Sequence, residues 1–166
     1  ADIPDGVVLV RGGKIAAVGR GISVPSGAKI VDLAGKHLYP AMIDANTTLG
    51  LVEIGSVKGT VDTSEVGRIN PDIRVEGSVN PSSEAIPVTR ANGVLLALVV
   101  PQGALLRGTS ALVRLDGWTW EEMTLRTPVG MHLSWPRVSV PTSWLEPRKG
   151  GEEIRKEKEE ALKDLT

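Results

Sequence analysis

An unbroken apolar run at residues 93–100, GVLLALVV, most strongly constrains what this chain can fold into. A strand of this length without polar alternation is typical of a parallel sheet that is covered on both faces. A second buried-type strand is expected at residues 42–48. A short helix is expected between the two strands at 83–91, with Ser82 or Ser83 as its N-cap. Strand, helix and strand in this order predict a parallel βαβ unit.

The first 39 residues predict a small β unit. Gly12 and Gly13 separate two β-rich runs at 7–11 and 14–18, and paired glycines favour a tight hairpin turn. A second strand pair is expected at 30–33 and 36–39. Such hairpins are marginal alone and pack on something larger. We therefore expect a β-sandwich-like portion at residues 1–39 and a second domain portion at 40–166.

The second portion contains further elements. Residues 110–115 predict a strand that turns at Asp116-Gly117 and pairs with 123–127, inside an excursion near 104–128. Three more segments follow: a third parallel strand at 129–135, a Pro-rich connection at 136–151 and a terminal helix at 152–165. The helix is rich in strong helix formers but has few apolar side chains to bury, so it is interpreted as truncated.

Composition excludes several classes of function. The 166 residues include no cysteine, which rules out disulfides and thiolate metal sites and is compatible with both cytoplasm and periplasm. The net charge of −1 offers no surplus that would attract nucleic acid or an anionic membrane. No apolar run approaches the ~20 residues of a membrane span. A soluble globular protein is expected, without a nucleic-acid or membrane partner.

Three features carry alternative readings. The long segment 50–81 is either a lid over a site or a solvated loop, with equal weight. His132 alternates with Gly130 and Ser134 on its expected strand, so it either faces a site or is an ordinary core histidine, which is favoured. The pair Trp118 and Trp120 either forms a binding platform or, in the favoured reading, packs the excursion against the rest of the domain.

Residues 30–50 read IVDLAGKHLYPAMIDANTTLG. They resemble the signature GK-x-φ-x-P-G-φ-I-D-x-H-x-H-x-G of the amidohydrolase superfamily, close to the imidazolonepropionase-like group, and the likeness runs from about Gly6 to Pro136. In that signature two histidines, one residue apart on a strand, bind a catalytic divalent metal. Here Asn46 and Thr48 stand at those positions, and Ala41 replaces a glycine.

The resemblance implies a fold and a cofactor. The fold class is α/β with a β part: a small β-sandwich portion plus the first strands of an incomplete (β/α)8 TIM-type barrel. A closed barrel of this type has about eight strands and ~250 residues. The family uses zinc or another divalent metal, for which an amide and a hydroxyl are poor ligands. Its other ligands come from later strands, expected beyond Thr166. Asp44 matches the motif aspartate and is interpreted as a structural hydrogen-bond acceptor; with His132 it is a candidate site-facing residue.

The function implied by the resemblance is that of a metal-dependent hydrolase in which a metal-activated water attacks a C–N bond, in amides or cyclic amides other than peptides. The chain is expected to be an N-terminal fragment of such an enzyme, and catalytically inert alone. The alternative is a non-catalytic subunit of the same fold with a structural or regulatory role. A weaker reading is a binding module built on the tryptophans. The expected partners are the remainder of its own barrel or another copy of the chain, and, in the parent protein, a small-molecule substrate.

Overall fold

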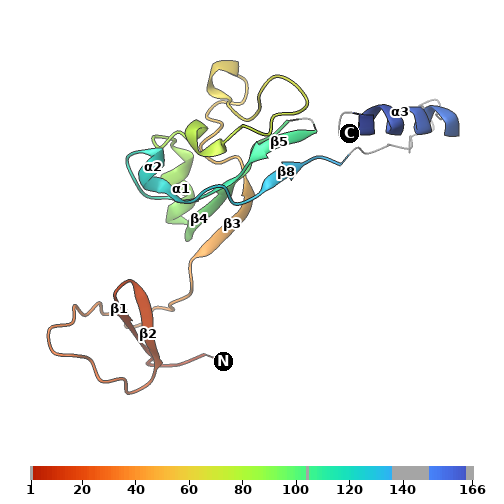
Figure 1. Cartoon of the computed structure of the whole chain (residues 1–166). Coiled ribbons are helices and arrows are strands. Elements are labelled where there is room, and N and C mark those ends of the chain that lie inside the picture. The colour runs from red at the N-terminus through yellow and green to blue at the C-terminus, as the bar shows by residue number, and fades with distance from the viewer. Residues whose placement is uncertain (1, 104, 136–149, 164–166) are drawn as a thin grey trace. The chain divides into compact units, whose positions relative to one another are not determined.

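The computed structural model describes residues 2–103, 105–135 and 150–163. The chain divides into two compact units, Ala1–Pro40 and Ala41–Thr166. Figure 1 shows the elements coloured in the order in which they follow along the chain. No helix within the described residues is both long enough and apolar enough to cross a lipid bilayer.

The first unit contains one β-hairpin. Strand β1 (Val7–Arg11) pairs antiparallel with β2 (Lys14–Gly19), which confirms the predicted hairpin. Gly12 and Gly13 take φ values of +58° and +73°. A two-residue turn with positive φ at both positions matches the right-handed twist of the strands, and only glycine adopts it without strain.

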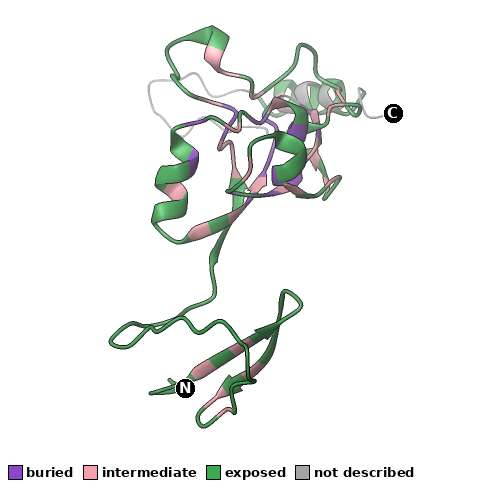
Figure 2. Ribbon diagram, turned by 90° about the vertical axis from the view of Figure 1, so that its left-hand side faces the viewer, coloured by how far each residue is buried: buried purple, intermediate pink, exposed green. Residues whose placement is uncertain are grey.

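The prediction of a second strand pair at 30–33 and 36–39 is wrong. The turn at its centre forms, since the Lys36 amide donates to the Leu33 carbonyl oxygen at 2.9 Å, but neither flank is a strand. Tyr39 is 73% exposed, and Figure 2 shows no buried residue among residues 2–40. A two-stranded hairpin is marginal in water unless one face is covered, and these described residues supply no covering layer.

The second unit is organised around a four-stranded sheet in the order β3-β4-β6-β7. Strand β3 (Met42–Thr47) and strand β4 (Val94–Val99) are parallel and joined through helix α1 (Ala85–Ala91), which confirms the predicted βαβ unit. Strand β6 (Ala111–Arg114) runs antiparallel to β4. The sheet is therefore mixed, with one parallel and two antiparallel pairings.

Strand β4 is less covered than its apolar sequence predicts. Ala97 and Val99 are fully buried on one face, whereas Leu96 and Leu98, whose side chains point to the opposite face, are only half-buried. Leu95, at the start of the strand, is 44% exposed. The prediction of burial on both faces is wrong because the described residues form a core on one side only. That core consists of Leu51, Val75, Val79, Ile86, Ala97, Val99, Ala111, Val113, Leu115 and Met123.

Helix α1 begins two residues later than predicted, and neither serine caps it. The N-cap is Glu84, which makes no side-chain capping bond. The Ser83 hydroxyl instead donates to the Glu53 carboxylate at 3.0 Å, and the Ser82 amide donates to the Asn80 side chain at 3.0 Å. Asn80 thus makes a local side-chain turn that competes with a serine cap.

Strand β7 (Thr124–Arg126) pairs antiparallel with β6, as predicted for 110–115 and 123–127. The connection is not the tight turn expected at Asp116-Gly117, because the short helix α2 (Trp120–Met123) lies between the strands. The Thr119 hydroxyl accepts a hydrogen bond from the Glu122 amide at 3.2 Å. Threonine followed three residues later by glutamate is a helix-start signal that outcompetes the hairpin turn.

A two-stranded sheet pairs β5 (Leu106–Thr109) with β8 (Met131–Leu133) antiparallel. The prediction of a third parallel strand at 129–135 is therefore wrong, because β8 pairs antiparallel with β5, a strand for which the sequence has no clear pattern. Helix α3 (Gly151–Lys163) confirms the terminal helix and carries an Arg155–Glu159 ion pair at 3.0 Å. Residues 136–149 of the expected connection and 164–165 of the expected helix lie outside the described residues.

Candidate functional site

The carboxyl ends of β3 and β4 lie together. The Val100 amide donates to the Thr47 carbonyl oxygen at 2.9 Å, directly after both strands end. The two motif positions flank this contact: Asn46 is exposed near the end of β3, and Thr48 is half-buried one residue past it. Ligands of parallel α/β sheets bind beyond the carboxyl ends of the strands, so this edge is the candidate site.

Asp44 lies two residues before Asn46 on the same strand. One of its carboxylate oxygens accepts a hydrogen bond from the Asn46 amide at 3.3 Å, and the residue is half-buried. The bond spans two residues along the chain, which is the local pattern by which aspartate fixes backbone conformation. Asp44 therefore orients the backbone of Asn46.

The donors at this edge do not fit a zinc ion. Within residues 2–103, 105–135 and 150–163, no three His, Cys, Asp or Glu side chains gather in a metal-binding arrangement. The positions of the family's two histidines present a neutral amide and a hydroxyl, whereas zinc takes imidazole, thiolate or carboxylate. No metal-dependent step is therefore assigned to these residues.

Glu53, near the start of the long segment between β3 and α1, accepts hydrogen bonds from two residues at the end of that segment. Its two carboxylate oxygens accept from the Asn80 side-chain amide at 3.1 Å and from the Ser83 hydroxyl at 3.0 Å. The Asn80 backbone amide donates in addition to the Gly50 carbonyl oxygen at 2.9 Å. Residue 53 near the start of the segment is thus tied to residues 80 and 83 at its end, which closes it into a compact loop.

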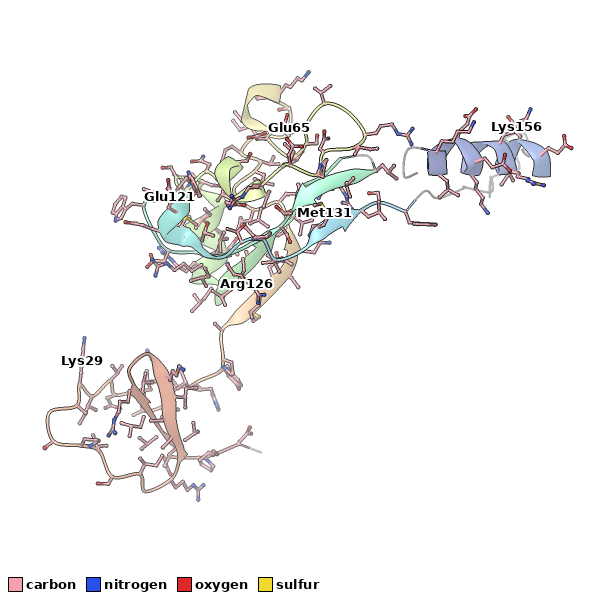
Figure 3. All side chains as sticks on the ribbon, in the orientation of Figure 1. Lys29, Glu65, Glu121, Arg126, Met131 and Lys156 are labelled. Atoms are coloured by element: carbon pink, nitrogen blue, oxygen red, sulfur yellow. The ribbon has the colours of Figure 1, made fainter. Side chains whose placement is uncertain are left out.

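The middle of this loop packs on the second sheet and on the chain after β4. It includes two 3₁₀ turns, η1 (Lys58–Thr60) and η2 (Val75–Ser78). Isolated bridges join Ile69 to Leu106 and Arg74 to Thr109. The Gln102 amide donates to the Thr63 carbonyl oxygen at 2.6 Å. The loop is thus docked against β5 rather than free in solvent. Figure 3 labels Glu65 of the loop and Met131 of β8, the strand that pairs with β5.

A small cavity lies where this loop meets the segment after β4. Its lining combines acidic and hydroxyl side chains of the loop with one guanidinium from β5. The lining residues are Asp62, Thr63, Ser64, Glu65, Ile73, Val75, Ser78, Pro101 and Arg107. Because Pro101 lies two residues past the end of β4, the cavity lies near the carboxyl end of that strand.

Glu76 carries a buried charge beside this cavity. It is 2% exposed, and one carboxylate oxygen lies 2.8 Å from both the Nε and the Nη2 atoms of Arg74. Its second oxygen, Oε2, is buried and has no hydrogen-bond partner. A buried carboxylate is retained only when paired, so this ion pair holds η2 in the loop.

His132 lies on β8 beside Arg107 of β5. Its pKa is lowered from the usual 6.5, first by partial burial and second by the positive charge of Arg107. His132 was singled out in the sequence, whereas Arg107 was missed. The only signal for Arg107 was its place before a Gly-Thr pair in a stretch not expected to form a strand.

The expectation that Trp118 packs the excursion against the domain is wrong. Trp118 is 91% exposed, and Trp120 is 37% exposed. The chain turns outward at Gly117, whose φ of +149° is rare for L side chains. The structure therefore separates these tryptophans from the carboxyl edge of the parallel strands: Trp120 begins α2, whose Met123 enters the core.

Comparison with known proteins gives consistent relatives. The chain is 38% identical over 68 residues to the D-hydantoinase of Geobacillus stearothermophilus, a match that covers 41% of this chain and 14% of that protein. It is 27% identical over 146 residues to the amidohydrolase tasK of Hapsidospora irregularis, which covers 86% of this chain and 14% of that protein. No protein-family model matches the chain.

A solved structure agrees with both relatives. The crystal structure of an amidohydrolase from Thermotoga maritima MSB8 superposes with a TM-score of 0.72 at 31% identity, covering 78% of this chain and 34% of that one. The fold of this chain is thus similar to part of an amidohydrolase structure. The chain is related to the amidohydrolase superfamily, and it spans 14% of the length of the curated relatives that it matches.

Proposed function

We propose that this chain is part of an amidohydrolase-like hydrolase that acts on non-peptide C–N bonds in amides or cyclic amides. The observation that carries the proposal is the combination of the Thermotoga likeness with the motif residues 40–50, which contain β3 and the residues that follow its carboxyl end. We further propose that β3 and β4 are the opening strands of a (β/α)8 barrel that these residues leave incomplete. Asp44 and His132 are the residues proposed to face its site.

We propose that the 166-residue polypeptide has no hydrolase activity by itself. Asn46 and Thr48 offer no charged or imidazole ligand, and the described residues contain no group of three metal ligands. A hydrolase of this type would therefore take its ligands from a later part of a longer polypeptide. Asn46 and Thr48 would then line the substrate side of the site as neutral hydrogen-bonding groups.

The test compares two polypeptides: the 166-residue chain alone and the natural polypeptide that contains these residues. Each is incubated with hydantoin, dihydrouracil and an N-acetyl amine, with added Zn²⁺ or Mn²⁺ and with a chelator. We expect metal-dependent ring opening or deacylation by the natural polypeptide, and a rate equal to the buffer blank for the 166-residue chain. Metal-dependent turnover by the chain alone would overturn the proposal of an inert portion.

A second candidate is a non-catalytic subunit of the same fold with a structural or regulatory role. The replacement of both motif histidines by Asn46 and Thr48 favours it, because loss of the first ligand pair is the change expected after catalysis is lost. The two candidates differ in the rest of the natural polypeptide. Later histidines and a catalytic aspartate there, together with turnover in the assay above, support the hydrolase; inactivity with every substrate supports the subunit.

We propose that the remainder of its own barrel, or another copy of the chain, covers the apolar surface that these residues expose. Ile30 is 74% exposed in the first unit, and Leu95 and Leu125 line an open hollow in the second. Exposed apolar faces and open strand edges pair with other protein. Light scattering of the purified 166-residue chain is expected to show a mass of two or more copies, or intact-mass analysis a bound second polypeptide. A clean monomer would contradict this.

A further inference from the structure

Arg107, the second residue of β5, has a buried donor atom without a partner. Its Nε atom is shielded from solvent and forms no hydrogen bond. Within the described residues Arg107 forms no ion pair, whereas Arg74 and Arg90 of the same unit are each paired with a carboxylate. Because the guanidinium keeps its proton in proteins, Nε is always a donor, and a buried donor on a charged group is costly to leave unmet.

The cavity that Arg107 lines has room for about one water molecule. The space open to the centre of a water molecule there is about 10 Å³. On this measure a site for one water needs roughly 10–15 Å³, together with two to four polar partners. A carboxylate group or a hydrated metal ion needs more space than this. Size therefore favours water as the occupant.

The loop between β3 and α1 supplies oxygen atoms to the same cavity. Five of its lining residues carry a carboxylate or hydroxyl side chain, namely Asp62, Thr63, Ser64, Glu65 and Ser78. Within the part of the chain that the structure describes, none of these five side chains forms a hydrogen bond or an ion pair. The Arg107 stem runs beside the loop, since its Cγ and the Ser64 Cβ lie 3.5 Å and 3.9 Å from the point that a Cβ on Gly103 would occupy. One water that accepts from Nε and donates to a loop oxygen would satisfy both sides.

This cavity lies at the junction between the loop and β5. The Gln102 amide donates to the Thr63 carbonyl oxygen at 2.6 Å, ahead of Arg107 in the sequence. The Thr109 amide donates to the Ile73 carbonyl oxygen at 2.8 Å, directly after it. A bridge from the Arg107 side chain would thus add a further attachment between two backbone hydrogen bonds that already dock the loop.

We propose that a single water molecule bridges the Arg107 Nε atom to a side-chain oxygen of this loop, and that the bridge helps to hold the middle of the loop on β5. A water site of this kind does not depend on the proposed hydrolase function. The competing explanation is attraction between the Arg107 charge and the carboxylates of Asp62 and Glu65 through solvent. The bridge requires an N–H group at the Nε position, whereas the attraction requires only a positive charge.

Arg107→Lys separates the two explanations. Lysine keeps the positive charge, but its side chain has a methylene group where arginine has Nε. In the natural polypeptide that contains these residues, we expect the variant to speed hydrogen exchange of the Gln102 and Thr109 amides by about tenfold or more, because a hydrogen bond to a charged group is lost. Mass spectrometry of a peptide spanning residues 101–109 measures this. Arg126→Lys, at an exposed arginine of β7 outside the cavity, is the matched control and should leave the exchange unchanged.

Two further measurements complete the comparison. Arg107→Met removes both the charge and the donor, and Arg107→Lys should match it. Added salt should leave the exchange of these amides in the natural protein unchanged, because a bridge through a buried atom is screened far less than attraction between exposed charges. If lysine protects the two amides as well as arginine does, or if salt alone releases them, charge attraction holds the loop and the proposal is overturned.

A crystal structure of the natural polypeptide locates the water directly. We expect a water roughly 2.7–3.2 Å from the Arg107 Nε atom and at a similar distance from a loop oxygen, and no water at that position in Arg107→Lys. A direct hydrogen bond from Nε to a protein oxygen, or a larger anion at that position, contradicts the proposal.

Discussion

Replacing Asn46 and Thr48 together by histidine is expected to create a zinc site that the natural sequence lacks. Asn46 lies on β3 and Thr48 directly after its last residue, and side chains two residues apart along extended backbone point to the same face, so the two imidazoles are expected to project side by side at the end of β3. We expect zinc affinity to increase on the order of a hundredfold or more. Competition with a chromophoric chelator at pH 7 measures this, and the gain should vanish near pH 5, where the imidazoles are protonated.

The control is the double replacement Asn46→Ala with Thr48→Ala, which removes the same side chains without adding a ligand. It should bind zinc no better than the natural chain. Asn46→His alone should give a small part of the gain, because one imidazole is a weak site. If the double histidine variant binds zinc no more tightly than the alanine control, then the two positions do not share a face and the assignment of the motif to β3 is wrong.

The parallel βαβ unit was predictable because local signals and tertiary structure agree there. The apolar run at 93–100 is too short and too rich in β-branched residues for a helix, and it became β4. Its partner β3 and helix α1 followed from the same patterns. The Gly12-Gly13 hairpin was equally predictable. Its two-residue turn needs positive φ at both positions, and glycine adopts positive φ readily.

Other elements depended on contacts that no local pattern contains. Residues 30–39 have the composition of a hairpin, but a hairpin needs a packing surface, and none of residues 2–40 is fully buried. Strand β5 is four residues with a central glycine, so it has no alternation to detect; the loop bridges at Ile69 and Arg74, with β8, define it. The tight turn predicted at Asp116-Gly117 does not form, because the capped helix α2 begins within the same few residues.

The sequence alone identifies some residues of the candidate site and misses others. Asn46 and Thr48 were found because a motif fixed their positions, and His132 because histidine is rare in this chain. Arg107 was missed, since its significance lies in what it fails to contact, which only side-chain geometry shows. Glu53 was missed for the opposite reason: its partners Asn80 and Ser83 lie about thirty residues away in sequence, as the separations of 27 and 30 show.

The second large effect is expected from Gly108→Ala, at the point where the long loop docks on β5. Gly108 has a φ of +94°, and a Cβ added there would lie 2.6 Å from the Ile73 carbonyl oxygen. That oxygen accepts from the Thr109 amide at 2.8 Å and from the Thr109 hydroxyl at 3.1 Å, so pushing it away breaks the docking. Backbone strain and overpacking together should cost roughly 2–4 kcal/mol, seen as a lower urea midpoint.

Gly103→Ala is the matched control, because it separates strain from collision. Gly103 also has a positive φ, +135°, but a Cβ there would meet the Arg107 Cγ at 3.5 Å and the Ser64 Cβ at 3.9 Å, both ordinary contacts. Its cost should be limited to backbone strain of roughly 1–2 kcal/mol. Gly108→Ala should also shift the His132 ring resonance, since β5 moves against β8. If both alanine variants lose the same stability, then the close approach of Ile73 to Gly108 does not hold the loop in place. The position of Ile73 in the lining of the cavity beside Arg107 is then not fixed by this contact.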